Sequence, residues 1–303
     1  MKRVLVTGAS GFIGSQALAP LLARDYDVHA VSRTRNPERV PGITWHRVDL
    51  FDPVAAAALI AATRPTHLLH FAWSLVAGGS AEPRDNLQCV LSSFDLLRKF
   101  QECGGSRAVI AGSCAEYDWK YGYCLEGVTP LVPDSLYGVC KNTLRQLCDD
   151  YARVSNLSTA WGRPFFVYGP HEPLPRFVGS VVSSLVRHET AHCWYAHIFR
   201  DFLHVTDVAS AFVALLDSDV QGAVNIASGR AVQLKTIAEY IAHRLDSMHL
   251  LQLATELKFD KVPLVVADVG RLTDMIGWSP EYDLERGLDD TIAWWKRRSA
   301  GAA

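Results

Sequence analysis

A tyrosine and a lysine near the middle of the chain are spaced so that they could move a proton together. Tyr137 and Lys141 lie four residues apart, so a helix would place them on one face, one turn from each other. A free tyrosine has a pKa of about 10, but a lysine ammonium on the next turn favours the phenolate and lowers that pKa. With a hydroxyl from Ser113 on the same reacting oxygen, the three side chains could exchange a proton with a sugar hydroxyl while a hydride moves at the same carbon.

A tyrosine four residues from a lysine is also common on solvated helix surfaces, so the spacing alone does not indicate a catalytic site. The start of the chain makes that interpretation more specific. The apolar run at 4–6 is typical of a buried parallel strand, which is expected over 3–7, and a glycine-rich segment and a helix to about residue 24 follow it. Gly8 allows a tight turn, Gly11 lets a pyrophosphate approach the backbone, and Gly14 lets the helix pack on the strand. The sequence therefore predicts a dinucleotide site formed here by Thr7, Gly8, Ser10, Gly11, Phe12, Ile13 and Gly14.

The end of the second predicted strand, at 26–31, indicates which dinucleotide binds. An acidic side chain usually holds the ribose hydroxyls of NAD at this place, whereas this chain has Ser32, Arg33 and Arg35. A hydroxyl and two guanidinium groups suit a 2′-phosphate, so the sequence favours NADP(H), with NAD(H) as the alternative. Two arginines in a loop can also be simply solvated and bind no cofactor. Asp49 follows a third strand and could bond the adenine amino group, and Leu50 is its neighbour.

Strands and helices alternate along the rest of the chain. Strands are expected at 45–48, 67–72, 107–111, 158–163, 202–205, 223–226 and 264–267, and helices at 85–103, 136–154, 177–187, 207–216, 234–245 and 284–297. Ligands bind at the carboxyl ends of parallel strands, which adds Phe71, Ala72, Trp73 and Pro164 to the predicted cofactor site. His70 lies inside an apolar run and is expected to be a core histidine.

The predicted architecture is α/β, a Rossmann doubly wound parallel sheet with a smaller C-terminal α/β substrate domain. The NADP-binding domain is expected over residues 1–165, with 201–222 and about 264–272 returning to it, and the substrate domain over 166–200 and 223–303. The net charge of −2 gives no reason to expect nucleic acid or a membrane as a partner. The seven cysteines show no paired or metal-ligand spacing, so no metal is expected, and we expect a cytoplasmic protein.

Nearly the whole chain resembles the extended short-chain dehydrogenase/reductases that act on nucleotide sugars, the NAD(P)-dependent epimerase/dehydratase family. TGASGFIG is similar to their TGxxGxxG, and Ser113, Tyr137 and Lys141 resemble their Ser/Thr-Tyr-Lys triad. VYGP at 167–170 and RDFLHVTDV at 200–208 also follow the family order. The resemblance implies hydride transfer at a sugar carbon, usually C4, with Tyr137 as acid/base, Ser113 orienting the oxygen and Lys141 holding the nicotinamide ribose.

The resemblance also implies a nucleotide-diphosphate sugar as substrate, and a homodimer formed through the helices at about 86–103 and 136–154. Arg200 would meet the substrate diphosphate, because a guanidinium pairs well with phosphate oxygens, and Phe177 and Val178 would lie near the base. The expected substrate-binding residues are Ser74, Cys114, Ala115, Glu116, Phe166, Phe177, Val178, Arg200 and Arg271. His171 could also face the site.

Departures from the family pattern narrow the chemistry. The 4,6-dehydratases of the family carry Asp-Glu directly after the hydroxyl residue, where this chain has Cys114 and Ala115, so water elimination is disfavoured. Phe166 stands where many relatives place an asparagine. The sequence favours an NADPH-dependent 4-ketoreductase of a nucleotide-diphospho-4-keto-6-deoxy sugar in deoxysugar biosynthesis. The alternatives are a nucleotide-sugar C4 epimerase with retained NAD, and a non-catalytic NADP-binding protein of the same fold.

Overall fold

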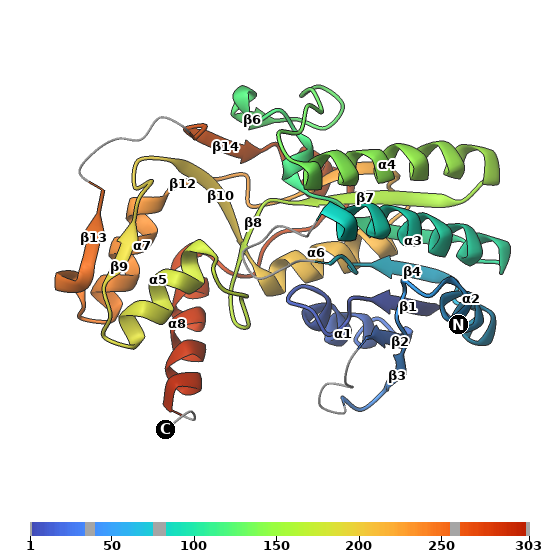
Figure 1. Ribbon diagram of the computed structural model, residues 1–303, viewed down its shortest axis with the longest axis horizontal. Coiled ribbons are helices and arrows are strands. Elements are labelled where there is room, and N and C mark those ends of the chain that lie inside the picture. Colours follow the sequence, from blue (N-terminus) through green and yellow to red (C-terminus); the bar gives the residue numbers. More distant parts are fainter. Residues whose placement is uncertain (1, 34–39, 75–82, 255–260, 301–303) are drawn as a thin grey trace.

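A seven-stranded parallel sheet forms the centre of the larger part of the molecule (Figure 1). The computed structural model describes residues 2–33, 40–74, 83–254 and 261–300. In spatial order the sheet runs β11-β7-β5-β4-β1-β2-β3, and every neighbouring pair is parallel. Its strands are β1 (Arg3–Thr7), β2 (Asp27–Ser32), β3 (Ile43–Arg47), β4 (His67–His70), β5 (Arg107–Ala111), β7 (Ser158–Pro164) and β11 (Gly222–Ile226).

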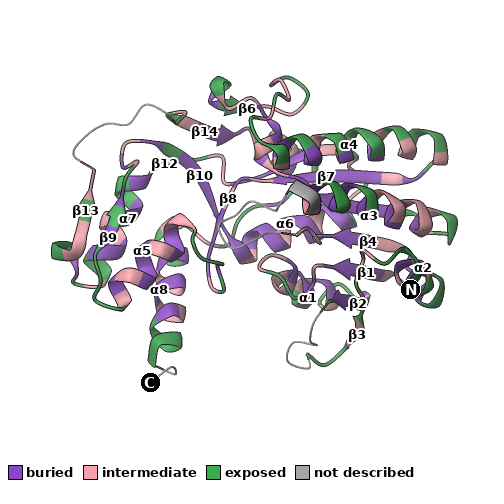
Figure 2. Ribbon diagram, viewed as in Figure 1, coloured by how far each residue is buried: buried purple, intermediate pink, exposed green. Residues whose placement is uncertain are grey.

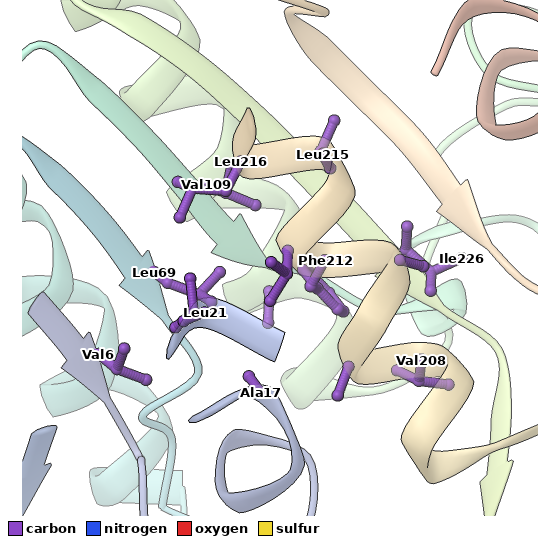
Figure 3. Packing of buried hydrophobic residues seen from close by; sticks show 14 of the residues in the cluster. Val6, Ala17, Leu21, Leu69, Val109, Val208, Phe212, Leu215, Leu216 and Ile226 are labelled. Atoms are coloured by element: carbon purple, nitrogen blue, oxygen red, sulfur yellow. The ribbon is translucent and has the colours of Figure 1, made fainter. Parts of the chain in front are cut away.

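Helices cover both faces of this sheet, which confirms the predicted doubly wound α/β fold. Successive residues of a strand point to opposite faces, so Val4 and Val6 join the core on one side while Leu5 joins the core on the other. Figure 3 shows the first core, where Phe212 and Leu216 pack against Leu69 and Val109. That face carries α1 (Gly14–Leu22) and α6 (Val205–Asp217), and the opposite face carries α2 (Pro53–Thr63), α3 (Pro83–Glu102) and α4 (Leu136–Ser155).

A smaller α/β part packs beside the large sheet, on the left in Figure 1. Its second sheet follows the order β12-β10-β14-β6, with β8 paired to β10, and β9 pairs with β13. The helices of this part share one core, which includes Val182, Ile241 and Ile292. Its elements are β6 (Tyr123–Cys124), β8 (Phe166–Tyr168), α5 (Phe177–Val186), β9 (Ala191–Cys193), β10 (Phe199–His204), β12 (Ala231–Gln233), α7 (Leu234–Arg244), β13 (Leu251–Leu253), β14 (Leu264–Ala267) and α8 (Leu284–Ala300).

The main differences from the sequence expectation lie in element ends and short elements. β4 ends at His70, two residues early, so Phe71 and Ala72 lie in the loop that follows. The sequence between the strand at 107–111 and the helix from 136 predicts one long loop at 114–133. This segment instead forms short helical turns at Cys114–Glu116 and Trp119–Tyr121 and strand β6, which pairs with β14. The segment from 223, expected to be mainly substrate domain, begins within β11 of the large sheet.

The strand order reverses between β1 and β4, and this reversal creates the place for a ligand. From β1 the chain first builds outward through β2 and β3, then returns to the other side of β1 with β4, β5, β7 and β11. Helices leaving adjacent strands in opposite directions leave a crevice at the carboxyl ends of β1 and β4. Figure 2 shows the central strands largely buried between their helices. None of the described helices is long and apolar enough to cross a bilayer.

Candidate active site

A cavity of about 450 Å³ opens at this crevice and gathers the predicted cofactor residues. Sixteen of the eighteen residues expected at the cofactor line it, together with the expected catalytic Ser113 and substrate residue Ser74. The sixteen are Gly8, Ser10, Gly11, Phe12, Ile13, Gly14, Ser32, Arg33, Asp49, Leu50, Phe71, Ala72, Trp73, Tyr137, Lys141 and Pro164. Thr7 lies beneath the cavity floor, and Arg35 falls outside the described residues.

The glycine-rich loop is packed so closely that side chains would not fit. Gly8 has φ +65°, and a Cβ there would lie 2.8 Å from the Ala72 amide nitrogen. A Cβ on Gly14 would lie only 2.2 Å from the Gly8 carbonyl oxygen, so the first turn of α1 can approach β1 only because residue 14 is glycine. The Gly11 amide donates to the Gly8 carbonyl, at 2.9 Å. This bare backbone at a helix N-terminus fits a dinucleotide pyrophosphate, and residues of the loop would hold it.

Thr7 supports the loop rather than facing a ligand. Its hydroxyl lies 2.7 Å from His70 Nδ1 and accepts a hydrogen bond from the Ala72 amide, at 3.3 Å. His70 Nε2 lies 2.8 Å from the hydroxyl of buried Ser93. Burial lowers the pKa of His70 to about 3, so the ring is neutral and satisfied on both nitrogens. This agrees with the interpretation of His70 as a core histidine.

The far end of the cavity carries the groups expected near a 2′-phosphate. The Ser32 and Ser10 hydroxyl oxygens lie 3.1 Å apart, which ties the end of β2 to the glycine-rich loop. Arg33 is exposed and lines the cavity next to them. The Asp49 carboxylate also lines the cavity and accepts a hydrogen bond from the Phe51 amide, at 3.0 Å. The described part of this end therefore offers a guanidinium and two hydroxyl groups, which suit a phosphate, together with one carboxylate, which suits hydroxyl or amino groups.

Tyr137 and Lys141 are positioned by the way α4 begins. The Ser135 hydroxyl caps this helix by accepting a hydrogen bond from the Gly138 amide, at 3.2 Å. A Cβ on Gly138 would lie 2.3 Å from the Ala115 carbonyl oxygen, so this glycine lets the first turn of α4 rest on the segment after Ser113. The contact brings the side chains of Tyr137 and Ser113 into hydrogen-bonding range.

The pKa values of Tyr137 and Lys141 differ from the sequence expectation. Burial raises the pKa of Tyr137 to about 12, although the hydrogen bond with Ser113 opposes this. Lys141 does not lower it as expected, because its ammonium donates to the Ala111 carbonyl, at 2.7 Å, and sits over the Trp73 ring. Burial also lowers the pKa of Lys141 to about 8. Tyr137 therefore keeps its proton at neutral pH and is set up to donate it.

Most residues expected to bind the substrate lie outside the cavity. Glu116 is fully buried in an ion pair with Arg163, at 2.7 Å, and is no substrate ligand in this arrangement. Arg200 is buried as well, and its guanidinium lies 5.7 Å from the centre of the Trp119 ring and 5.5 Å from that of Phe166. The expected residues absent from the cavity wall are Cys114, Ala115, Glu116, Phe166, Phe177, Val178, Arg200 and Arg271.

The other five residues expected to bind the substrate lie elsewhere in the fold. Val178 belongs to the core of the smaller part, and half-buried Phe177 packs on that core. Arg271 donates to the Gln221 carbonyl just before β11, at 2.7 Å. Cys114 is buried, which raises the pKa of its thiol, and Ala115 is half-buried beside it.

Arg176 is a cavity residue that the sequence analysis missed. It precedes α5, and its guanidinium lies 5.7 Å from the centre of the Phe12 ring in the glycine-rich loop. The smaller part thus places the positive charge of Arg176 beside the glycine-rich loop of the large part. A basic residue directly before an apolar helix was the only available signal. His171, which could have faced the site, is exposed and packs on Trp294 of α8 instead, with ring centres 4.7 Å apart.

The fold is that of a dinucleotide-binding α/β protein, and Ser113, Tyr137 and Lys141 line its cavity together. The family model described as "NAD dependent epimerase/dehydratase family" matches residues 4–227, and the chain belongs to that family. It is therefore an NAD(P)-dependent enzyme of the extended short-chain dehydrogenase/reductase type.

Three known proteins illustrate the range of the family. The chain is 24% identical over 325 residues to a UDP-glucose 4-epimerase of Rhizobium meliloti (strain 1021), covering 98% of each. It is 25% identical over 313 residues to a GDP-6-deoxy-D-mannose reductase of Pseudomonas aeruginosa, again covering 98% of each. The solved structure of MoeE5 in complex with UDP-glucuronic acid and NAD superposes with a TM-score of 0.86 and 28% identity, covering 98% of this chain and 99% of that one.

Proposed function

We propose that this protein is an NADPH-dependent 4-ketoreductase of a nucleotide-diphospho-4-keto-6-deoxy sugar. When bound, the cofactor supplies the hydride to C4 of the sugar. Tyr137 donates its proton to the resulting C4 oxygen, Ser113 holds that oxygen, and Lys141 binds the ribose. The observation that carries the proposal is geometric: Ser113, Tyr137 and Lys141 line the cavity together, while the carboxylate nearest to Ser113 in the sequence, that of Glu116, is buried in an ion pair with Arg163.

The surroundings of Ser113 support reduction over elimination. A dehydratase needs a second carboxylate acid or base beside the sugar, and the two residues after Ser113 are Cys114 and Ala115. The next carboxylate, that of Glu116, is sequestered by Arg163. The raised pKa of the buried Cys114 thiol makes it a poor base. The GDP-6-deoxy-D-mannose reductase relative is consistent with this assignment, and Arg33 and Ser32 support NADPH as the reductant.

A nucleotide-sugar C4 epimerase is the second candidate, favoured by the comparisons. The relative from Rhizobium meliloti is named a UDP-glucose 4-epimerase, and MoeE5 was solved with NAD. An epimerase oxidises and then reduces the same carbon with a retained NAD, so it uses the same three side chains and needs no further acid. It predicts tightly bound NAD and no net consumption of cofactor.

The deciding experiment mixes the purified protein with NADPH and a panel of dTDP-, CDP-, GDP- and UDP-4-keto-6-deoxy sugars. Loss of NADPH absorbance with one sugar, slower with NADH, would support the ketoreductase and identify the nucleotide. Tyr137→Phe is the control, because it should abolish turnover while cofactor binding and fold are kept. No loss with any sugar, together with NAD released from the denatured protein, would overturn the proposal in favour of the epimerase.

We also propose that the enzyme acts in the cytoplasm as a homodimer and that Arg176 takes part in binding a diphosphate. Arg200 remains a proposed contact for the substrate diphosphate. Because Trp119 and Phe166 cover its guanidinium, substrate binding would then require these rings to move. Burial lowers the pKa of Arg200 to about 10, which still leaves it charged at neutral pH.

A further inference from the structure

The buried carboxylate of Glu116 does not line the cavity but bonds the backbone of Ser113, which does. Glu116 Oε1 accepts a hydrogen bond from the Ser113 amide, at 2.8 Å, and a second from Trp161 Nε1, also at 2.8 Å. Its other oxygen, Oε2, accepts from Arg163 Nε at 2.7 Å. The side chains of Glu116 and Arg163 have exposed fractions of 0% and 1%. The catalytic serine is therefore attached by its own backbone to a fully buried ion pair.

The same short turn fixes the hydroxyl of Ser113. Its Oγ accepts a hydrogen bond from the Ala115 amide, at 3.1 Å, while the Glu116 carboxylate accepts from the Ser113 amide. Because the Ala115 amide already donates to Oγ, the hydroxyl proton is left free to point to the reacting oxygen or to Tyr137. Glu116 thus secures the backbone from which the Ser113 hydroxyl reaches the site.

Only a carboxylate satisfies this arrangement. Three N–H donors converge on Glu116, and both carboxylate oxygens accept, whereas a glutamine would present an NH₂ group to one of the donors. Gly112 leaves room for the Glu116 carboxylate, because a Cβ on residue 112 would lie only 2.5 Å from Glu116 Oε1. Beyond Arg163 the network continues through the Tyr117 hydroxyl, at 2.9 Å, to Asn225 Oδ1 on β11, at 2.8 Å.

We propose that Glu116 is a positioning residue for the reaction, which holds Ser113 in register with Tyr137 and contributes a fixed negative charge behind the pair. The inference rests on the proposed roles of Ser113 and Tyr137. Consistent with it, the charge of Glu116 raises the pKa of Tyr137, adding to the larger effect of burial, and raises that of Lys141 against the larger effect of burial. Its function is therefore separate from the substrate contact expected from the sequence.

Glu116→Gln is the first test, with Tyr117→Phe as the matched control in the same buried network. Glu116→Gln should lower kcat about tenfold to hundredfold, because small displacements of a reacting group have effects of that size, while the NADPH affinity stays within about twofold. The high-pH limb of the rate profile should move to lower pH, because the lost negative charge raises the pKa of both Lys141 and Tyr137 in the wild type. Tyr117→Phe should keep the wild-type kcat and profile, although it lowers the melting temperature.

Two results would overturn the inference. One is a Glu116→Gln enzyme with wild-type kcat and pH profile. The other is a Tyr117→Phe enzyme that loses as much kcat as Glu116→Gln, which would show a merely structural network. If Glu116→Gln does not fold, Glu116→Gln combined with Arg163→Met replaces it, since the amide oxygen can then face the Ser113 amide without an unpaired guanidinium. The double variant should keep most of the wild-type kcat, because the amide oxygen still accepts a hydrogen bond from the Ser113 amide, and a large loss of kcat would count against Glu116.

The test remains informative if the proposed function fails. If the wild type reduces no 4-keto sugar but epimerises one, the same kcat and pH comparison applies to that reaction. If it turns over neither, crystal structures of Glu116→Gln and Tyr117→Phe give the answer. The Ser113 hydroxyl should move away from Tyr137 only in Glu116→Gln, and an unmoved serine there would overturn the positioning role.

Discussion

The Lys141 ammonium lies 3.8 Å from the centre of the Trp73 ring and 5.9 Å from that of the Tyr137 ring. The Lys141 ammonium therefore contacts the face of the Trp73 indole, whereas the helix spacing predicts a contact with Tyr137. The Ala111 carbonyl accepts a hydrogen bond from the same ammonium. This partly apolar wall buries the lysine and lowers its pKa to about 8. Lys141 thus titrates much nearer neutrality than a solvated lysine does.

The first prediction concerns this titration. We expect kcat/KM to fall as the pH rises through about 8, because Lys141 then loses the charge with which it is proposed to bind the ribose. Lys141→Arg should keep its charge and move this limb to higher pH, since a guanidinium does not titrate in that range. Steady-state rates across pH for both proteins would check this, and an unchanged limb in Lys141→Arg would assign it to another group.

The second prediction concerns the choice of cofactor. Arg33→Ala should weaken NADPH binding about tenfold to hundredfold and leave NADH binding nearly unchanged, because a charge-assisted contact to a phosphate is lost in one case only. Fluorescence titration with both cofactors measures the ratio. Arg24→Ala is a suitable control, since Arg24 pairs with Asp217 at 3.4 Å and does not line the described cavity wall. Equal losses for NADPH and NADH would argue against a 2′-phosphate contact.

The third prediction concerns the glycine-rich loop. Gly14→Ala should weaken NADPH binding at least about tenfold and lower the melting temperature, because its Cβ would meet the Gly8 carbonyl at 2.2 Å and backbone cannot move aside cheaply. Gly104→Ala is the control: this glycine has φ +91° and no atom within 4 Å of its Cβ position, so only backbone strain is expected. Unchanged NADPH affinity in Gly14→Ala would contradict the close packing of α1 on β1.

Local sequence signals brought sixteen of the eighteen residues expected at the cofactor to the wall of one cavity. The bounds of β1 and β5 were predicted correctly, because each is a short apolar run followed directly by glycine or a helix start. Such motifs place their residues at strand ends, and parallel strands bring those ends to one edge. The alanine run at 55–58 predicts only part of α2, which extends beyond it on both sides and is capped by Asp52, whose side chain accepts hydrogen bonds from the Val54 and Ala55 amides.

The residues that sequence reasoning misplaced depend on contacts between distant segments. Glu116 faces Arg163 only because β5 and β7 are neighbours, a pairing that no local pattern encodes. Arg176 reaches Phe12 only through the packing of the smaller part on the large sheet. The partner of Lys141 is likewise Trp73, from a different strand end. Spacing within one helix cannot reveal which of several nearby groups a side chain will contact.

The fourth prediction concerns the proposed homodimer. Exposed apolar side chains follow one another on the two neighbouring helices: Leu87 and Leu91 on α3 are 57% and 67% exposed, and Val139 and Leu147 on α4 are 45% and 41% exposed. Leu91→Arg should convert a dimer to a monomer in light scattering, because it places a charge in an apolar interface. Val54→Arg, at a 76% exposed site on α2, should not. A monomeric wild type, or a dimer unaffected by Leu91→Arg, would refute an interface through α3.

The last prediction concerns stability and arises from Glu172. Its carboxyl is buried, and its Oε2 has no hydrogen-bond partner in the described part of the chain. Burial raises the pKa of Glu172 from 4.5 to about 8, so between these values the folded protein binds a proton that the unfolded chain does not. The stability that this group contributes is thus fully present below about pH 4.5 and is lost as the pH rises through about 8.

Glu172→Gln should remove that dependence, because a glutamine cannot ionise. Relative to the wild type, the free energy of unfolding of the variant should rise with pH over this range, by up to about 5 kcal/mol in total. Urea unfolding at several pH values measures the difference. Glu281→Gln, at an exposed carboxyl, should run parallel to the wild type. A Glu172→Gln curve parallel to the wild type would mean that the Glu172 carboxylate finds enough solvent or countercharge to ionise normally in the folded protein, with Arg176, whose charge already lowers this pKa, as the nearest source.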